Sequence, residues 1–206
     1  MLQSCLSPGT IEAGCDEAGR GCLAGPVFAA AVILPMDYAN PLLNDSKKLG
    51  EKMRNKLRHD IERDAMDWAV ASIDNREIDV LNILRSTIKA MHRALDMLKI
   101  RPGHIVVDGN LFFRYQTIPH TCIVKGDGTY ASVAAASVLA KTHRDEYMRM
   151  IHQDYSQYGW DMNKGYGTRA HRSAIGKYGI SPYHRRSFSL FERQRYLDFS
   201  YGPAKP

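Results

Sequence analysis

The spacing of hydrophobic residues changes along the chain from strand-like to helix-like. A short apolar segment at 11–15 leads through a glycine-rich connection to a run of small and β-branched residues at 27–34. These segments predict two adjacent strands. Apolar residues recur at helical spacing in 47–66 and again in 78–98, which predicts two amphipathic helices. Ser46 is the expected N-cap of the first helix.

The second half of the chain interleaves short strands with helices. Compact β-branched runs at 105–107 and 122–124 predict two more strands, each followed by turn residues. The alanine-rich segment 130–153 predicts a long helix buried against a sheet, and 168–178 predicts another helix. The order of elements predicts an α/β fold with a central mixed sheet flanked by helices and a helical C-terminal segment. We expect one domain over 11–190, an N-terminal extension over 1–10 and a tail over 191–206.

Composition narrows the class of protein. The 206 residues, 44% of them hydrophobic, suit one globular domain and exclude a disordered chain. The longest uncharged stretch, 22–36, is interrupted by Pro26 and Pro35 and is shorter than the roughly 20 apolar residues of a membrane span. The four cysteines lack paired metal or redox spacing, and no signal peptide is evident. We expect a soluble, cytoplasmic protein with no membrane contact.

The net charge of +6 is unevenly distributed. Residues 1–140 carry 16 basic and 16 acidic side chains, whereas 141–206 carry 12 basic and 6 acidic ones. A basic C-terminal third can bind a nucleic-acid backbone through phosphate contacts. A solvated cationic surface without a partner explains the charge equally well.

Acidic residues follow the predicted strands: Asp16 and Glu17 after the first, Asp108 after the third and Asp127 after the fourth. Active sites of α/β sheets gather at strand ends, where side chains from several strands meet. Clustered carboxylates repel one another unless a cation neutralises them, and oxygen ligands favour Mg²⁺ or Mn²⁺. Two such ions form a clamp suited to phosphodiester hydrolysis.

Structural explanations compete with this reading. Asp127 precedes a predicted helix and is a candidate N-cap, and Asp108-Gly109-Asn110 is an ordinary turn sequence. Asp16 and Glu17 are harder to explain in this way, because unpaired charge next to a core strand is costly to bury.

Two glycine-flanked motifs are typical of ligand contact. Glycines beside an arginine in Gly19-Arg20-Gly21 allow close main-chain approach while the guanidinium reaches a phosphate. Tyr166, between two glycines, can stack on a sugar or base. An exposed turn and a packing tyrosine are the alternatives.

The segment Gly14-Cys15-Asp16-Glu17-Ala18-Gly19-Arg20-Gly21 closely resembles the ribonuclease HII family. The similarity continues in family order over about residues 11 to 188. Its further motifs are Asn44-Asp45-Ser46-Lys47-Lys48-Leu49, Val107-Asp108-Gly109-Asn110, Val124-Lys125-Gly126-Asp127, Ala134-Ala135-Ala136-Ser137-Val138-Leu139-Ala140-Lys141, Lys164-Gly165-Tyr166-Gly167-Thr168 and His184-Arg185-Arg186-Ser187-Phe188.

The resemblance implies a ribonuclease H-like fold and metal-dependent hydrolysis of RNA paired with DNA. It also implies incision on the 5′ side of single ribonucleotides in duplex DNA, leaving 3′-hydroxyl and 5′-phosphate ends, with two Mg²⁺ or Mn²⁺ ions. The implied acidic metal ligands and catalytic residues are Asp16, Glu17, Asp108 and Asp127. By the same resemblance, the groups that sense the ribose 2′-hydroxyl are Gly19, Arg20 and Gly21, and Tyr166 stacks on the following sugar.

Further phosphate contacts are expected from the motifs at 45–48 and 184–188, with helix capping and surface solvation as alternatives. The candidates are Asp45, Ser46, Lys47, Lys48, Arg185 and Arg186. The sequence departs from the commonest family pattern in having Cys22 where proline is frequent, and Gly128-Thr129-Tyr130 where a Ser-Lys pair often follows the last aspartate.

Two other functions remain open at this point. One is a hybrid nuclease similar to ribonuclease HIII, although that family usually carries an additional N-terminal domain and lacks the Gly-Arg-Gly arrangement. The other is a non-catalytic RNA- or hybrid-binding module. The expected partners are RNA–DNA hybrid and ribonucleotide-containing duplex DNA, with the protein acting as a monomer. The segment Gln194-Arg195-Tyr196-Leu197-Asp198-Phe199 also resembles sliding-clamp docking peptides, although a last helical turn packed on the body is the alternative.

Overall fold

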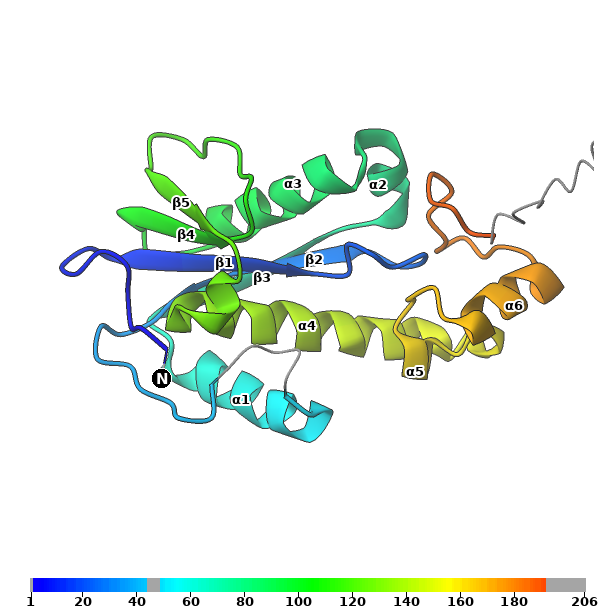
Figure 1. The fold of residues 1–206 in the computed structure, drawn as a ribbon, viewed down its shortest axis with the longest axis horizontal. Helices are drawn as coiled ribbons and strands as arrows, with labels where there is room; N and C mark the ends of the chain where they lie inside the picture. The colour runs from blue at the N-terminus through cyan, green and yellow to red at the C-terminus, as the bar shows by residue number, and fades with distance from the viewer. Residues whose placement is uncertain (1, 44–48, 192–206) are drawn as a thin grey trace, which may run out of the picture.

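The computed structural model describes residues 2–43 and 49–191 and contains a five-stranded mixed sheet in the order β3-β2-β1-β4-β5 (Figure 1). The first three strands pair antiparallel, whereas β4 and β5 run parallel to β1. This confirms the α/β architecture expected from the sequence. The strands are β1 Glu12–Ala18, β2 Val27–Ile33, β3 Asp67–Ile73, β4 His104–Asp108 and β5 His120–Ile123.

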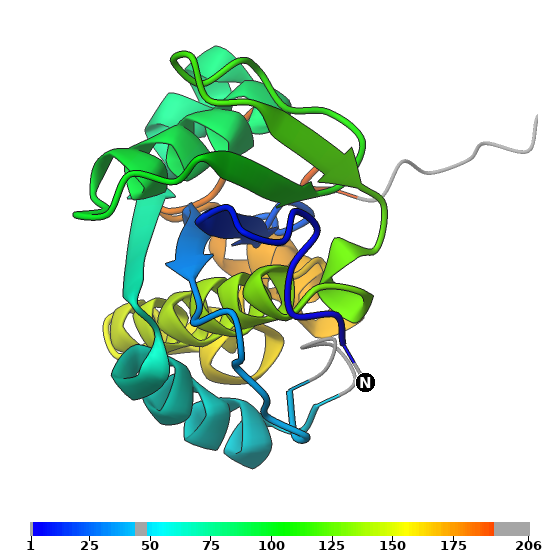
Figure 2. The ribbon, with the colours of Figure 1, turned by 90° about the vertical axis from the view of Figure 1, so that its left-hand side faces the viewer.

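Helices cover both faces of the sheet (Figure 2). Helix α3 packs on one face and the long helix α4 on the other, with α1 against the outer side of α4. Helices α5 and α6 lie near the C-terminal end of α4 (Figure 1). The helices are α1 Glu51–Asp64, α2 Asn75–Leu81, α3 Ile83–Asp96, α4 Ala131–His152, α5 Trp160–Asn163 and α6 Arg169–Tyr178, with 3-10 turns η1 Gly126–Gly128 and η2 Ser156–Tyr158.

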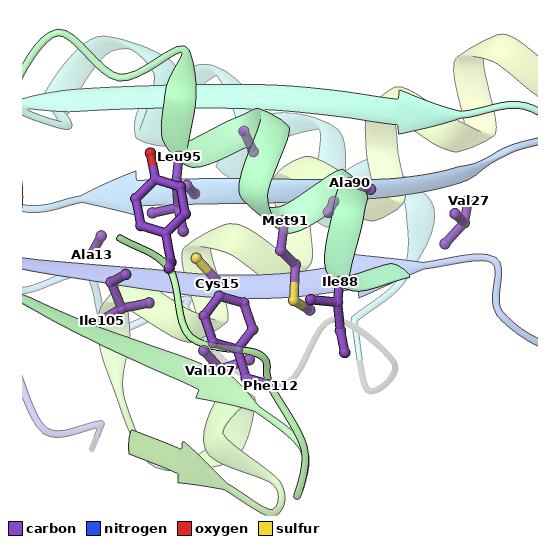
Figure 3. Packing of buried hydrophobic residues seen from close by; sticks show 14 of the residues in the cluster. Ala13, Cys15, Val27, Ile88, Ala90, Met91, Leu95, Ile105, Val107 and Phe112 are labelled. Atoms are coloured by element: carbon purple, nitrogen blue, oxygen red, sulfur yellow. The ribbon is translucent and has the colours of Figure 1, made fainter. Parts of the chain in front are cut away.

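Strand β1 sends alternate residues to the two faces of the sheet. Cys15 packs with Met91 of α3 in the cluster shown in Figure 3. Gly14 faces α4, where a Cβ atom would lie 2.2 Å from the main-chain carbon of Ser132. Glycine therefore permits the close approach of α4 to β1. Asp16 lies two residues further along the strand, on the same face as Gly14.

The first helix is shorter than predicted, and one strand was not predicted. Helix α1 begins at Glu51 with Gly50 as its N-cap, so Ser46 is not the cap. Residues 67–73 form β3, which pairs along its whole length with β2. Its sequence has few β-branched residues, and its strand conformation depends on this pairing. No helix in the described ranges has the length and apolar composition needed to cross a bilayer.

The segment predicted as one helix over 78–98 is two helices separated at Asn82. Its φ of 69° is left-handed, and its side-chain oxygen accepts a hydrogen bond from the amide of Arg85. Asn82 therefore ends α2 and caps α3. Apolar spacing continues through such a break, so the periodicity alone did not reveal it. The predicted helices at 130–153 and 168–178 are confirmed as α4 and α6.

Candidate active site

A cavity of about 210 Å³ lies where β1 and β4 end. The register of these parallel strands places Cys15 beside Val107, so Asp16 and Asp108 are the next neighbours on the same face. Asp16 and Glu17 lie inside β1 rather than after it, which corrects the sequence expectation. The cavity is lined by Asp16, Glu17, Ala18, Gly19, Arg20, Gly21, Asp108, Ser137, Lys141 and Tyr166.

The carboxylates in this cavity repel one another. Asp16 is only 3% exposed, and burial, together with the charges of Glu17 and Asp108, raises its pKa well above the usual range. A hydrogen bond from Ser137 and one from the Glu17 amide, 2.6 Å long, act in the opposite direction. The fold therefore gathers carboxyl groups where their ionised forms are unfavourable in the protein alone.

Asp127 occupies a different position from the other three acids. It is buried in η1 and is not among the residues that line the cavity. Asp108 is nevertheless joined to η1, because its Oδ1 accepts a 2.7 Å hydrogen bond from the Gly126 amide. The N-cap of α4 is Tyr130, so the capping explanation for Asp127 is wrong.

The carboxylates fit a hard divalent cation by their chemistry. They offer only oxygen donors, and a bound cation would relieve the repulsion that raises the pKa of Asp16. Within residues 2–43 and 49–191, no three Asp, Glu, His or Cys side chains already form a metal cage. The site thus has suitable ligands in neighbouring positions rather than a finished coordination shell.

The Gly19-Arg20-Gly21 segment forms one wall of the cavity. Gly19 has a φ of 96°, and a Cβ there would lie 2.0 Å from Nε of Arg144. Both the backbone conformation and the close contact therefore require glycine. The guanidinium of Arg20 is about half exposed and lies 3.3 Å from a carboxylate oxygen of Glu17.

Tyr166 reaches the cavity from the loop between α5 and α6 and is 43% exposed. Its main-chain carbonyl lies 2.9 Å from Nδ1 of His171. Because a carbonyl only accepts, Nδ1 carries the proton, and Nε2 of His171 accepts the indole N–H of Trp160 at 3.0 Å. His184 lies 3.2 Å from the same Nε2. Burial lowers the pKa of both histidines, so the pair is neutral at pH 7. His171 binds the main chain of the tyrosine loop, and His184 packs against His171.

Two cavity residues were not among the site residues predicted from the sequence. Ser137 and Lys141 are four residues apart on α4 and project from one face of the helix. Ser137 hydrogen-bonds Asp16, and the ammonium of Lys141 pairs with Asp145. Polar residues at helical spacing in an otherwise alanine-rich buried segment were the signal that could have identified them.

The two neighbouring arginines differ in position. Arg185 is completely buried, and its guanidinium donates to the carbonyls of Gly25 and Arg20 at 2.9 and 3.0 Å. This corrects the expectation that Arg185 is a surface phosphate contact, since its charge serves the main chain. Arg186 is exposed and stays a candidate phosphate contact. The remaining predicted contacts fall outside the described residues: Asp45, Ser46, Lys47, Lys48 and the clamp-like segment 194–199.

Comparisons with known proteins agree on one family. The family model described as Ribonuclease HII matches residues 13–191. Ribonuclease HII of Bacteroides thetaiotaomicron is 58% identical over 92% of this chain and 95% of its own length. Ribonuclease HII of Phocaeicola vulgatus is 56% identical over 98% of this chain and all of its own length.

Solved structures support the same fold. Ribonuclease H2 from Pyrococcus horikoshii OT3 superposes with a TM-score of 0.72 at 27% identity, covering 87% of this chain and 94% of that one. The Archaeoglobus fulgidus RNase HII, solved in a complex with PCNA, superposes with a TM-score of 0.71 at 24% identity. The match covers 91% of this chain and 98% of that one. The extent of the sequence match favours this family over the ribonuclease HIII alternative. The chain belongs to the ribonuclease HII family, metal-dependent endoribonucleases that hydrolyse RNA paired with DNA.

Proposed function

We propose that the cavity at the ends of β1 and β4 is the active site and that it incises on the 5′ side of ribonucleotides embedded in duplex DNA. The observation that carries this proposal is that one cavity gathers the repelling carboxylates, the Gly19-Arg20-Gly21 segment and Tyr166. The first group suits a cation, and the other two suit a sugar–phosphate backbone. The RNA strand of continuous hybrids is the second substrate.

Asp16, Glu17 and Asp108 would hold the divalent cations, Mg²⁺ or Mn²⁺. Bound there, two such ions supply an activated water and stabilise the leaving 3′-oxygen of the scissile phosphodiester. Asp127 is proposed as the fourth acidic residue of the metal site, which it would approach from η1. The products are a 3′-hydroxyl and a 5′-phosphate.

The chain's own residues would select the substrate. Main-chain groups of Gly19 and Gly21 contact the ribose 2′-hydroxyl, which distinguishes RNA from DNA. Arg20, half exposed beside the carboxylates, contacts the phosphate. Tyr166 stacks on the sugar of the next deoxynucleotide. Lys141, held by Asp145 at the cavity wall, adds positive charge beside the same backbone.

The test uses a labelled DNA duplex that contains a single ribonucleotide, with Mg²⁺ or Mn²⁺. We expect one incision, directly 5′ of the ribonucleotide, and none in the all-DNA duplex. Asp108→Asn should abolish incision, whereas the matched variant Asp154→Asn, at an exposed position that does not line the cavity, should not change it. Near-normal incision by Asp108→Asn, or equal cutting of all-DNA duplex, would contradict the proposal.

Clamp docking through Gln194–Phe199 and a monomeric state are separate proposals. The Archaeoglobus fulgidus neighbour was solved as a complex with PCNA. Removing residues 192–206 and measuring binding to a sliding clamp tests whether the tail docks in this chain. Unchanged binding after this truncation would refute the proposal. Light scattering tests the monomeric state, and a dimer mass would refute it.

A further inference from the structure

Two buried arginines lie directly behind the segments that would contact substrate. Arg144 of α4 is 1% exposed, and Arg185 is completely buried. Within the part of the chain that the structure describes, all the hydrogen-bond acceptors of the two guanidiniums are main-chain carbonyls. Burying a cation without a carboxylate partner is costly, so this arrangement requires a compensating role.

Arg144, on α4, joins two separate segments of the chain. Its guanidinium donates to the carbonyls of Pro26 at 3.1 Å, Ala24 at 3.2 Å and Lys164 at 2.8 Å. Its Cζ also lies 6.0 Å from the ring centroid of Tyr166. These contacts connect the strand-entry segment before β2 with the loop that carries the tyrosine.

The same side chain fills the space beside Gly19. A Cβ at position 19 would lie 2.0 Å from Nε of Arg144 and 2.6 Å from its Cδ. Because three hydrogen bonds hold this guanidinium, it cannot move away at low cost. The left-handed conformation of Gly19 is therefore supported by the buried arginine as well as by the turn itself.

Arg185 supports the next residue of the same segment. It donates through Nη1 to the carbonyl of Arg20 at 3.0 Å and through Nε to that of Gly25 at 2.9 Å. Its own amide donates to the carbonyl of Leu23 at 2.8 Å. Its Nη2 is buried without a hydrogen-bond partner among the described residues. Burial lowers the pKa of Arg185 to about 10, so the group is still charged at neutral pH.

Cys22 lies between the two arginines and the tyrosine. It is completely buried and forms an isolated antiparallel bridge with Tyr166. The Leu23 amide extends this bridge with a 2.8 Å bond to the carbonyl of Gly165. Hydrogen bonds thus join the segment 19–25 to the tyrosine loop, and Arg144 and Arg185 bind the main chain behind them.

We propose that Arg144 and Arg185 are positioning residues that determine where the enzyme cuts, because they fix the Gly19-Arg20-Gly21 segment relative to Tyr166. This inference rests on the proposed function of that cavity. The main-chain groups that contact the ribose and the ring that contacts the next sugar belong to different parts of the chain. Only their fixed separation lets the enzyme recognise a ribonucleotide followed by a deoxynucleotide.

The test measures the position of cutting as well as its rate. The substrate is a duplex in which one strand has four ribonucleotides followed by DNA, compared with a continuous hybrid. Wild-type enzyme should cut mainly 5′ of the last ribonucleotide. In Arg185→Met, cuts should spread to the other ribonucleotides. The preference for the junction over the hybrid should fall about tenfold, since misplacements near 1 Å cost up to roughly 100-fold.

A control separates positioning from loss of stability. Leu95→Ala removes buried contacts in the core under α3, on the far face of the sheet from Arg144. It should lower the melting temperature without changing the cutting pattern. If Arg185→Met does not fold, the cutting pattern of Arg185→Lys is the test. Lysine keeps the positive charge, but its single ammonium cannot bind the carbonyls of Gly25 and Arg20 in the same geometry.

The outcomes are distinguishable. Wild-type enzyme that does not cut at the junction would overturn the proposed function itself. Wild-type cutting at the junction, with arginine variants that lose activity equally at every position and on both substrates, would overturn this inference and leave the function intact. A shifted cutting pattern in the arginine variants alone would support it.

Discussion

Gly14→Ala tests how tightly the fold couples sheet packing to the proposed active-site cavity. The new Cβ would lie 2.2 Å from the main-chain carbon of Ser132 and 2.4 Å from the amide nitrogen of Val133. Both atoms belong to the first turn of α4, so no side-chain rotation relieves the contact. The helix must move away from β1.

The size of the effect follows from these distances. Ordinary van der Waals contact begins at 3.4 Å, so the first turn of α4 must shift by about 1 Å. Overpacking of this kind costs roughly 3 kcal/mol, which lowers the melting temperature of a chain of this length by about 6 to 12 °C. The shift also moves Ser137 away from Asp16, and a 1 Å error near the chemistry costs up to roughly 100-fold in rate.

Thermal unfolding and single-ribonucleotide incision measured on the same preparation provide the assay. Gly176→Ala is the matched control, because it makes the same chemical change inside α6 where nothing lies within 4 Å of the new Cβ. That variant should be stabilised by up to about 1 kcal/mol, since alanine is a better helix former than glycine.

Two results would refute the reasoning at different steps. A melting temperature of Gly14→Ala within about 2 °C of wild type would show that the sheet and α4 do not need the close approach. A large fall in melting temperature with full incision at a temperature where the variant is folded would show that α4 does not position the cavity.

Three further predictions concern charge and backbone conformation. Asp16→Asn should reduce cleavage by about 100-fold or more yet raise the melting temperature in EDTA at pH 7. The reason is that the pKa of Asp16 is raised in the folded state, so its ionisation costs stability at pH values above the unfolded-state pKa of about 4. A lower melting temperature would contradict this. Burial and the neighbouring His171 lower the pKa of His184 to about 4, so the unfolded chain binds this proton more readily than the folded one. The free energy of unfolding should therefore decrease as the pH falls from about 6.5 to about 4. Denaturant unfolding should therefore show a pH slope there that is weaker in His184→Gln, and an equal slope would refute the assignment. Asn82→Ala should lower the free energy of unfolding by about 1 to 2 kcal/mol, because it removes the hydrogen bond that caps the Arg85 amide and places alanine at a positive φ. Asn82→Gly should lower it by only a few tenths of a kcal/mol, and equal losses in the two variants would refute this.

Much of the fold followed from local patterns. The long helix at 130–153 and the strands around 105–107 and 122–124 were predicted because their apolar residues are continuous and their ends carry turn residues. The strand β3 was not predicted, since its pairing with β2 decides its conformation. The break at Asn82 was missed because hydrophobic spacing continues across it.

The candidate site was predicted in part. Asp16, Glu17 and Asp108 were selected because active sites of α/β sheets gather at strand ends and because their motifs resemble ribonuclease HII, and the structure does bring them to one cavity. The contributions of Ser137 and Lys141 were not recognised, since they depend on which face of α4 meets β1. Arg185 was predicted to contact phosphate because its motif is basic, and the sequence contains no sign that the side chain is buried.

The sequence by itself determined the family, the acidic residues and the glycines of the Gly19-Arg20-Gly21 segment, because these are properties of residue type and order. Only the tertiary structure decided that Asp16 lies beside Asp108 and that Arg144 and Arg185 are buried and donate to main-chain carbonyls. The physical reason is that strand register and burial arise from contacts between distant segments. A basic residue near the C-terminus can face solvent or hold a loop, and only packing selects between these two roles.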